Sequence, residues 1–139
     1  MVAYNKFNAF VEHVCEKVHD LSADALTVAL TAAANAPVAT NSVLADLTQI
    51  AYTNLSTRVI TVASSSQTSG TYTLGLTDLV LTASGGAVAT FRYVAVYNDT
   101  PTSPVDPLIA WFDHGSDVTL ADGETFTIDW TDDALFTLT

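Results

Sequence analysis

Hydrophobic and polar residues alternate with a period of two along most of the chain after residue 25, as they do in β-strands. In the first such segment Leu26, Val28 and Leu30 alternate with Thr27, Ala29 and Thr31. The same kind of pattern predicts further strands at 58–63, 71–77, 79–82, 90–97, 108–112, 118–120, 125–130 and 135–138. Short strands spaced about ten residues apart predict a mainly β fold. We therefore expect a single domain over 1–139, with an antiparallel β-sandwich or jelly roll of eight or nine short strands over 25–139.

The amino-terminal residues follow a helical period instead. Apolar residues recur there at three- and four-residue spacing and form one stripe: Phe7, Phe10, Val11, Val14, Val18 and Leu21. This predicts one amphipathic helix over 1–21, which Asn5 could cap. So short a helix is marginal alone. Its stripe must dock on this chain's own sheet or on a neighbouring subunit.

The connections carry weaker signals. Pro37 marks a loop over 32–42, and 43–50 is either one helical turn capped by Ser42 or an irregular edge. Asp122-Gly123 is a hairpin-turn sequence.

Two strands have no polar face. In 91–97 one face carries Phe91, Tyr93, Ala95 and Tyr97, and the other carries Arg92, Val94 and Val96. In 108–112, Leu108, Ala110 and Phe112 oppose Ile109 and Trp111. Strands of a sandwich normally show one face to water. Both faces of these strands therefore need cover, either from the amino-terminal segment or from another subunit.

Charge excludes one class of partner. The chain has 15 acidic residues and 4 basic ones, with a net charge of -11, so it lacks the positive surface that nucleic-acid binding requires. The low share of charged residues, 14%, favours a protein that associates with others. A single cysteine excludes an internal disulfide. We expect no export signal and no membrane-spanning segment.

No motif predicts catalysis, a cofactor or a metal. His13 and His19 are six residues apart, roughly 240° around a helix, so they should not share a face or form a metal pair. Cys15 should be a small buried apolar residue. The carboxylates near the carboxyl end are expected to be solvated turn residues: Asp113, Asp117, Asp122, Glu124, Asp129, Asp132 and Asp133. We therefore expect a protein that is not an enzyme.

Four segments resemble a family of small virion proteins of tailed bacteriophages. They are AYNKFNAFVEHVCEKVHDL (3–21), APVATNSVLADLTQI (36–50), TASGGAVATFRYVAVYNDT (82–100) and DPLIAWFDHGSDVTLADGETFTI (106–128). The chain is similar in particular to decoration, or cement, proteins of icosahedral heads. The resemblance implies a non-enzymatic protein on the capsid exterior, made in the host cytoplasm, that bridges major capsid protein subunits as a dimer or trimer.

Docking would then use exposed apolar and cationic side chains. The candidate interface residues are Phe7, Phe10, Val11 and Val14 of the helix, Arg92, Tyr97 and Trp111 of the sheet, and Lys6 and Arg58 as partners for acidic capsid surface. The alternative is a glycan-binding jelly-roll module of the tail or head surface, with a shallow groove near Trp111 or Trp130.

Overall fold

Antiparallel strands dominate the protein, whose computed structural model describes residues 3–130 and 134–139. The elements in chain order are β1 (Asn5–Lys6), α1 (Asn8–Cys15), β2 (Leu26–Thr31), the 3-10 turns η1 (Ala33–Asn35) and η2 (Leu44–Asp46), β3 (Val62–Thr68), β4 (Thr71–Leu76), β5 (Leu79–Thr82), β6 (Phe91–Asn98), β7 (Leu108–Val118), β8 (Thr125–Ile128) and β9 (Ala134–Leu138). The mainly β fold with one helix near the amino terminus confirms the predicted fold class.

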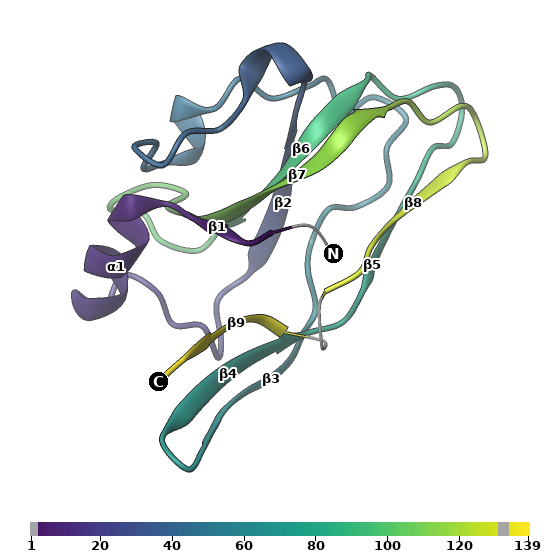
Figure 1. Ribbon diagram of the computed structural model, residues 1–139. Helices are drawn as coiled ribbons and strands as arrows, with labels where there is room; N and C mark the ends of the chain where they lie inside the picture. The colour runs from purple at the N-terminus through teal and green to yellow at the C-terminus, as the bar shows by residue number, and fades with distance from the viewer. Residues whose placement is uncertain (1–2, 131–133) are drawn as a thin grey trace.

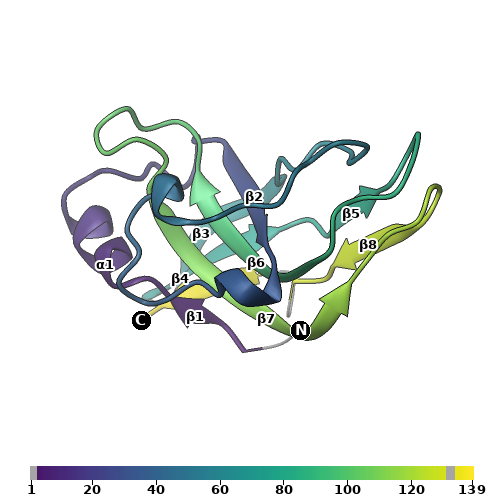
Figure 2. The same ribbon diagram turned by 90° about the horizontal axis from the view of Figure 1, so that it is seen from above.

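The strands form three sheets arranged like a sandwich (Figure 1). The largest has the order β1-β7-β6-β2, and it faces a three-stranded sheet, β3-β4-β9, and a ribbon of β5 and β8. All pairings are antiparallel. Seen from above, α1 and the β5–β8 ribbon lie at opposite ends of the molecule (Figure 2).

One face of the four-stranded sheet packs against the other two sheets. Val94 and Val96 of β6 lie in a core cluster with Leu74 of β4, Leu81 of β5 and Ile128 of β8, all of them buried. This cluster is the interior of the sandwich.

The other face of that sheet is covered from within the chain. Ala95 and Tyr97 of β6 and Leu108 of β7 join a second buried cluster with Phe7, which is fully buried, and with Leu47. Two segments outside the sandwich therefore cover this face: the residue before α1 and the turn η2. The predicted need for cover on both faces is met within a single chain.

The segment 43–50 takes the helical-turn form of the two alternatives. The Asp46 carboxylate accepts hydrogen bonds from the backbone N–H groups of Ser42 (2.7 Å) and Val43 (3.2 Å). The cap is thus made by Asp46, and Ser42 contributes only its backbone. This turn presents Leu44 and Leu47 to the second cluster.

The amino-terminal helix is shorter than the predicted 1–21. Asn5 pairs with Trp111 across β1 and β7, and the cap position falls at Phe7, so Asn5 does not cap the helix. At the other end Lys17 has a positive φ of 63°, which no helix continues through. Spacing alone could not show where the helix begins and ends. Phe7 and Val18, which lie on either side of it, continue the three- and four-residue spacing of apolar residues.

The strand predicted at 58–63 lies further along the chain, at 62–68. Residues before it run beside β2, where Val59 bridges Thr27 and the Ile60 N–H donates to the Leu26 carbonyl (2.8 Å). The polar β3 is instead fixed by a two-residue turn, Ser69-Gly70, in which both residues have positive φ. That geometry is favoured for tight hairpins.

The predicted strands 108–112 and 118–120 prove to be one long strand up to Val118, and the Asp122-Gly123 hairpin is wrong. β8 pairs with β5 and not with β7. The Asp122 carboxylate accepts from the Gly85 N–H (2.8 Å), and the Gly123 N–H donates to the Ala83 carbonyl (2.9 Å). The turn is therefore held against the Gly85-Gly86 turn that follows β5.

Covering the second face should make Phe7 a core residue in energetic terms. We expect Phe7→Ala to lower the free energy of unfolding by about 3–5 kcal/mol, as for other buried phenylalanines. The matched change Val11→Ala, on the exposed side of α1, should shift it by less than about 0.5 kcal/mol. Denaturant unfolding of both variants measures this; equal losses would contradict the assignment.

Candidate functional site

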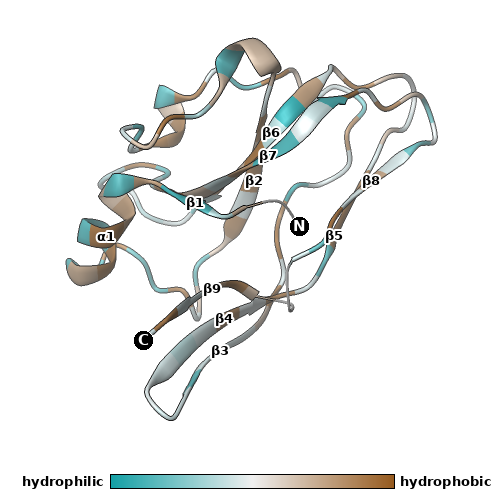
Figure 3. Ribbon diagram, in the orientation of Figure 1, coloured by the Kyte–Doolittle hydropathy of each residue, from teal (hydrophilic) through white to brown (hydrophobic). Residues whose placement is uncertain are grey.

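A groove of about 360 Å³ lies between α1 and the edge strand β9. We call it the α1–β9 groove; its lining residues are Tyr4, Lys6, Phe10, Val11, Val14, Cys15, Phe136, Thr137 and Leu138. Hydrophobic colouring appears on both α1 and β9 in Figure 3.

Aromatic contacts form the floor of the α1–β9 groove. The ring of Phe136 lies 5.4 Å from that of Phe10 in an edge-to-face arrangement and 6.5 Å from that of Tyr4. Tyr4 also packs edge-on against Phe112 of β7, at 5.9 Å. These contacts, which aromatic rings favour, tie the amino-terminal segment to β9 and fix the spacing of the two walls.

The rim of the groove is apolar and nearly uncharged. Val11 is 48% exposed and Leu138 is 55% exposed, on opposite walls. Among the lining residues that the structure describes, the one charged side chain is Lys6, in a chain with 15 carboxylates. β9 is also the last strand of its sheet, so one of its edges is open in the part of the chain described. The groove can therefore accept an apolar segment and an acidic group.

The structure brings four of the predicted interface residues together here: Lys6, Phe10, Val11 and Val14 all line the groove. Phe7 and Tyr97 do not reach the surface, because both are buried in the second cluster. Phe10 lines the floor but is almost fully buried. Phe7 and Tyr97 are therefore core residues, and Phe10 offers only a small exposed surface at the groove floor.

Arg58 is bound to its own chain. Its guanidinium lies 3.7 Å above the ring centre of Tyr52 and donates to the Val28 carbonyl. Such stacked arginines hold local structure together. These contacts give Arg58 a structural role within the chain, and its predicted role as a partner for acidic capsid surface stays a prediction.

Arg92 and Trp111 lie outside the groove. Arg92 makes two hydrogen bonds to Asp113, at 2.8 and 2.9 Å, which hold the pKa of that carboxyl below its ordinary value. Trp111 is half-buried, with its ring centre 4.6 Å from that of Phe7. The nine predicted residues thus do not form one continuous surface.

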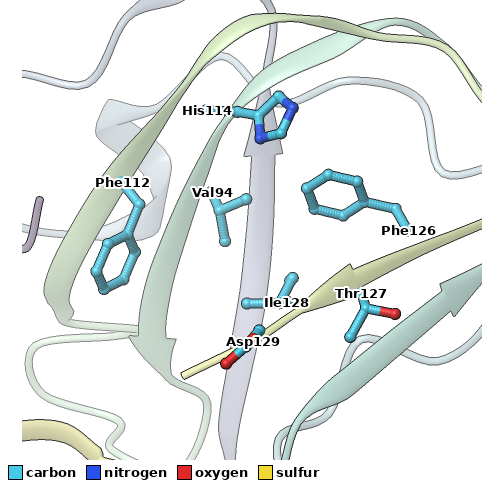
Figure 4. Close-up of a pocket in the computed structure, with 7 residues that line it drawn as sticks. All are labelled: Val94, Phe112, His114, Phe126, Thr127, Ile128 and Asp129. Atoms are coloured by element: carbon cyan, nitrogen blue, oxygen red, sulfur yellow. The ribbon is translucent and has the colours of Figure 1, made fainter. Parts of the chain in front are cut away.

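A second hollow, of about 450 Å³, opens between β7 and β8. Figure 4 shows its lining: Val94, Phe112, Phe126 and Ile128 form apolar walls, with His114 at one end, Asp129 at the other, and Thr127 beside them. We call it the β7–β8 pocket. Neither tryptophan lines it: Trp130 is buried, and its indole N–H donates to the Thr77 carbonyl (3.1 Å). Residue patterns could not indicate this pocket, because the Asp122-Gly123 turn sequence predicts that 118–120 pairs with 125–130.

His13 and His19 lie next to each other, with ring centres 5.9 Å apart, although a continuous helix would have separated them. The helix ends between them, and the chain turns back. His19 also packs against Phe10, at 5.3 Å. Burial and, secondly, the neighbouring His13 lower the pKa of His19 to about 4, against a smaller opposing effect of Asp24.

Further features bear on chemistry. Cys15 is exposed, contrary to the prediction. In the described residues no group of three or more His, Cys, Asp or Glu side chains could hold a metal ion. Asp132 and Asp133 lie outside those residues.

The helices that are described include none with the length and apolar character needed to cross a membrane.

Arg58 and Lys6 should differ in how much each stabilises the folded protein. We expect Arg58→Ala to lower the free energy of unfolding by about 1–3 kcal/mol, because it removes a stacked ring contact and a charged hydrogen bond. Lys6→Ala, at the exposed groove rim, should change it by less than about 0.5 kcal/mol. Thermal or denaturant unfolding distinguishes them, and an Arg58→Ala variant as stable as the parent would contradict the internal role.

No family model, curated protein or solved structure matches this chain.

Proposed function

We propose that this chain is a non-enzymatic decoration protein of a bacteriophage head, which binds the major capsid protein through the α1–β9 groove. The observation that carries the proposal is the groove itself, with Val11 and Leu138 exposed on facing walls and Lys6 at the rim. The resemblance of 3–21, 36–50, 82–100 and 106–128 to virion proteins supports the same role.

The geometry supports binding by burial of apolar surface. Each Å² of apolar area removed from water contributes about 25 cal/mol, so one small groove gives a weak contact. On a capsid the same contact repeats over a symmetric lattice, and a dimer or trimer that engages several subunits gains further through effective concentration. Weak local contacts then sum to strong reinforcement of the shell.

Charge directs this contact to one side of the molecule. With a net charge of -11, most of the surface repels an acidic partner and keeps free copies apart. The groove lining has Lys6 and no carboxylate among the described residues. The matching site on the capsid should therefore be an apolar segment with an acidic side chain opposite Lys6.

Charged substitutions on the groove walls test this proposal. Val11→Lys and Leu138→Lys should each weaken binding to purified heads that lack the protein by at least about tenfold, because a lysine must be desolvated on docking. Val80→Lys and Val105→Lys are matched controls, since Val80 and Val105 are as exposed but lie outside the groove. Cosedimentation with heads measures all four.

The Val80→Lys and Val105→Lys controls show whether a loss of binding is specific to the groove. Unchanged cosedimentation of Val11→Lys and Leu138→Lys would remove the groove as the docking surface. Failure of the parent protein to bind heads at all would contradict the decoration role.

The β7–β8 pocket favours a second candidate, recognition of a neutral glycan. Its mixture of an aromatic ring, Phe126, with the polar groups of His114, Thr127 and Asp129 is of the kind that fixes small ligands. Its described lining residues include no Lys or Arg, so an anionic sugar is disfavoured. Glycan-array binding that Asp129→Asn abolishes and Val80→Lys preserves would support this role over head decoration.

A further inference from the structure

Four polar side chains join the end of α1 to the end of β6. The amide nitrogen of Asn98, which is fully buried, donates to Asp24 (2.6 Å) and lies 3.1 Å from Nδ1 of His19. His13, near the last turn of α1, packs beside His19. The link therefore runs from α1 through His19 to the four-stranded sheet.

The hydrogen bonds of Asn98 determine which ring nitrogen of His19 carries the proton. The Asn98 carbonyl oxygen accepts from the Thr100 N–H (3.1 Å), so the amide orientation is fixed and its nitrogen faces His19 as a donor. Nδ1 of His19 must then accept, and the neutral ring carries its proton on Nε2. That nitrogen and Nδ1 of His13 are both buried and lack a hydrogen-bond partner in the described structure.

This proton arrangement does not suit a metal. A metal-binding histidine coordinates through a nitrogen without a proton and donates its other N–H to an acceptor. His19 has the reverse arrangement, because Nδ1 faces a donor and Nε2 carries the proton. His19 is therefore not arranged as a metal ligand.

We propose that His13, His19, Asn98 and Asp24 form a proton-sensitive latch, which holds the end of α1 against the sheet at neutral pH and releases it in acid. A proton added at Nδ1 of His19 would point an N–H at the Asn98 amide donor and place a cation beside His13. The carboxylate of Asp24 is already engaged by Asn98 and by the Asp20 N–H (2.8 Å). Separating His19 from Asn98 removes the repulsion between these two N–H donors.

The groups around His19 define the response. From α1, His13 disfavours a positive charge on His19 and the ring of Phe10 covers one side; from the connecting loop, Asp24 favours the charge; from β6, the facing group is the uncharged Asn98 amide. The pKa of His19 is lower in the closed form, about 4, than in an opened or unfolded chain. The open form therefore binds more protons between pH 6.5 and 4, and closure is lost as the pH falls through that window.

The latch bears on docking because α1 carries Val11 and Val14, one wall of the α1–β9 groove. This consequence rests on the proposed function: release of α1 would separate the two walls. Attachment to the capsid would then weaken in acid.

Hydrogen exchange of the full chain tests the latch directly. The backbone N–H groups of Glu16 and Val18, which bond to Glu12 and His13 (2.9 Å each), report on this end of α1. After correction for intrinsic rates, their protection should fall by of order 100-fold between pH 7 and pH 4, while that of Val96 in β6 falls much less. His19→Asn keeps an acceptor near the Nδ1 position without a titrating group, and should abolish the fall. His114→Asn, at the other end of the molecule, should leave it unchanged.

A titration of the native chain by NMR covers the case in which His19→Asn does not fold. His19 should titrate below pH 5; a midpoint near 6.5, or an unchanged loss of protection in His19→Asn, overturns the latch. If the latch opens as expected but the parent protein does not bind heads at pH 7, the proposed function fails and the latch stands.

Discussion

Over 94–97 and 108–112 the central strands β6 and β7 are apolar on both faces, and this constraint governs the rest of the structure. One face is buried in the sandwich against β4, β5 and β8, and the other needs a separate cover. The chain provides it with Phe7 and with Leu44 and Leu47 at the turn η2. The amino-terminal segment must therefore run along the edge of β7, which places α1 beside β9 and forms the α1–β9 groove as a consequence.

Because the chain itself covers the central strands, the surface available to a partner lies elsewhere. If another subunit covered the second face, Tyr97 and Phe7 would be interface residues; here they are core residues. The surface left for a partner is smaller, with Val11, Leu138 and Lys6 around the open edge of β9. Uncharged edges are places where another chain can pair. In so acidic a chain, this groove is a place where association meets little charge repulsion.

A feature of the fold or of the site could be predicted from the sequence where its local residue pattern is compatible with only one structure. The alternation in β2, β4, β5 and β9 left little choice, and those strands form where the pattern placed them. The apolar rhythm from Phe7 to Leu21 fits a helix, but it fits a short helix between an extended segment and a turn equally well. The polar β3 had no pattern to reveal it, because it is an exposed edge strand. The closeness of His13 and His19, and the β7–β8 pocket, depend on where the chain turns and which strands pair, so no spacing could indicate them.

Hydrogen exchange of the protein alone and bound to phage heads tests most directly the claim that the central strands are already covered and that the α1–β9 groove makes the contact. The account predicts that amides of α1 and β9 exchange more slowly on the heads, while those of β6 and β7 are strongly protected in both states. Strong protection gained by β6 and β7 only on binding, with α1 and β9 unchanged, would contradict it.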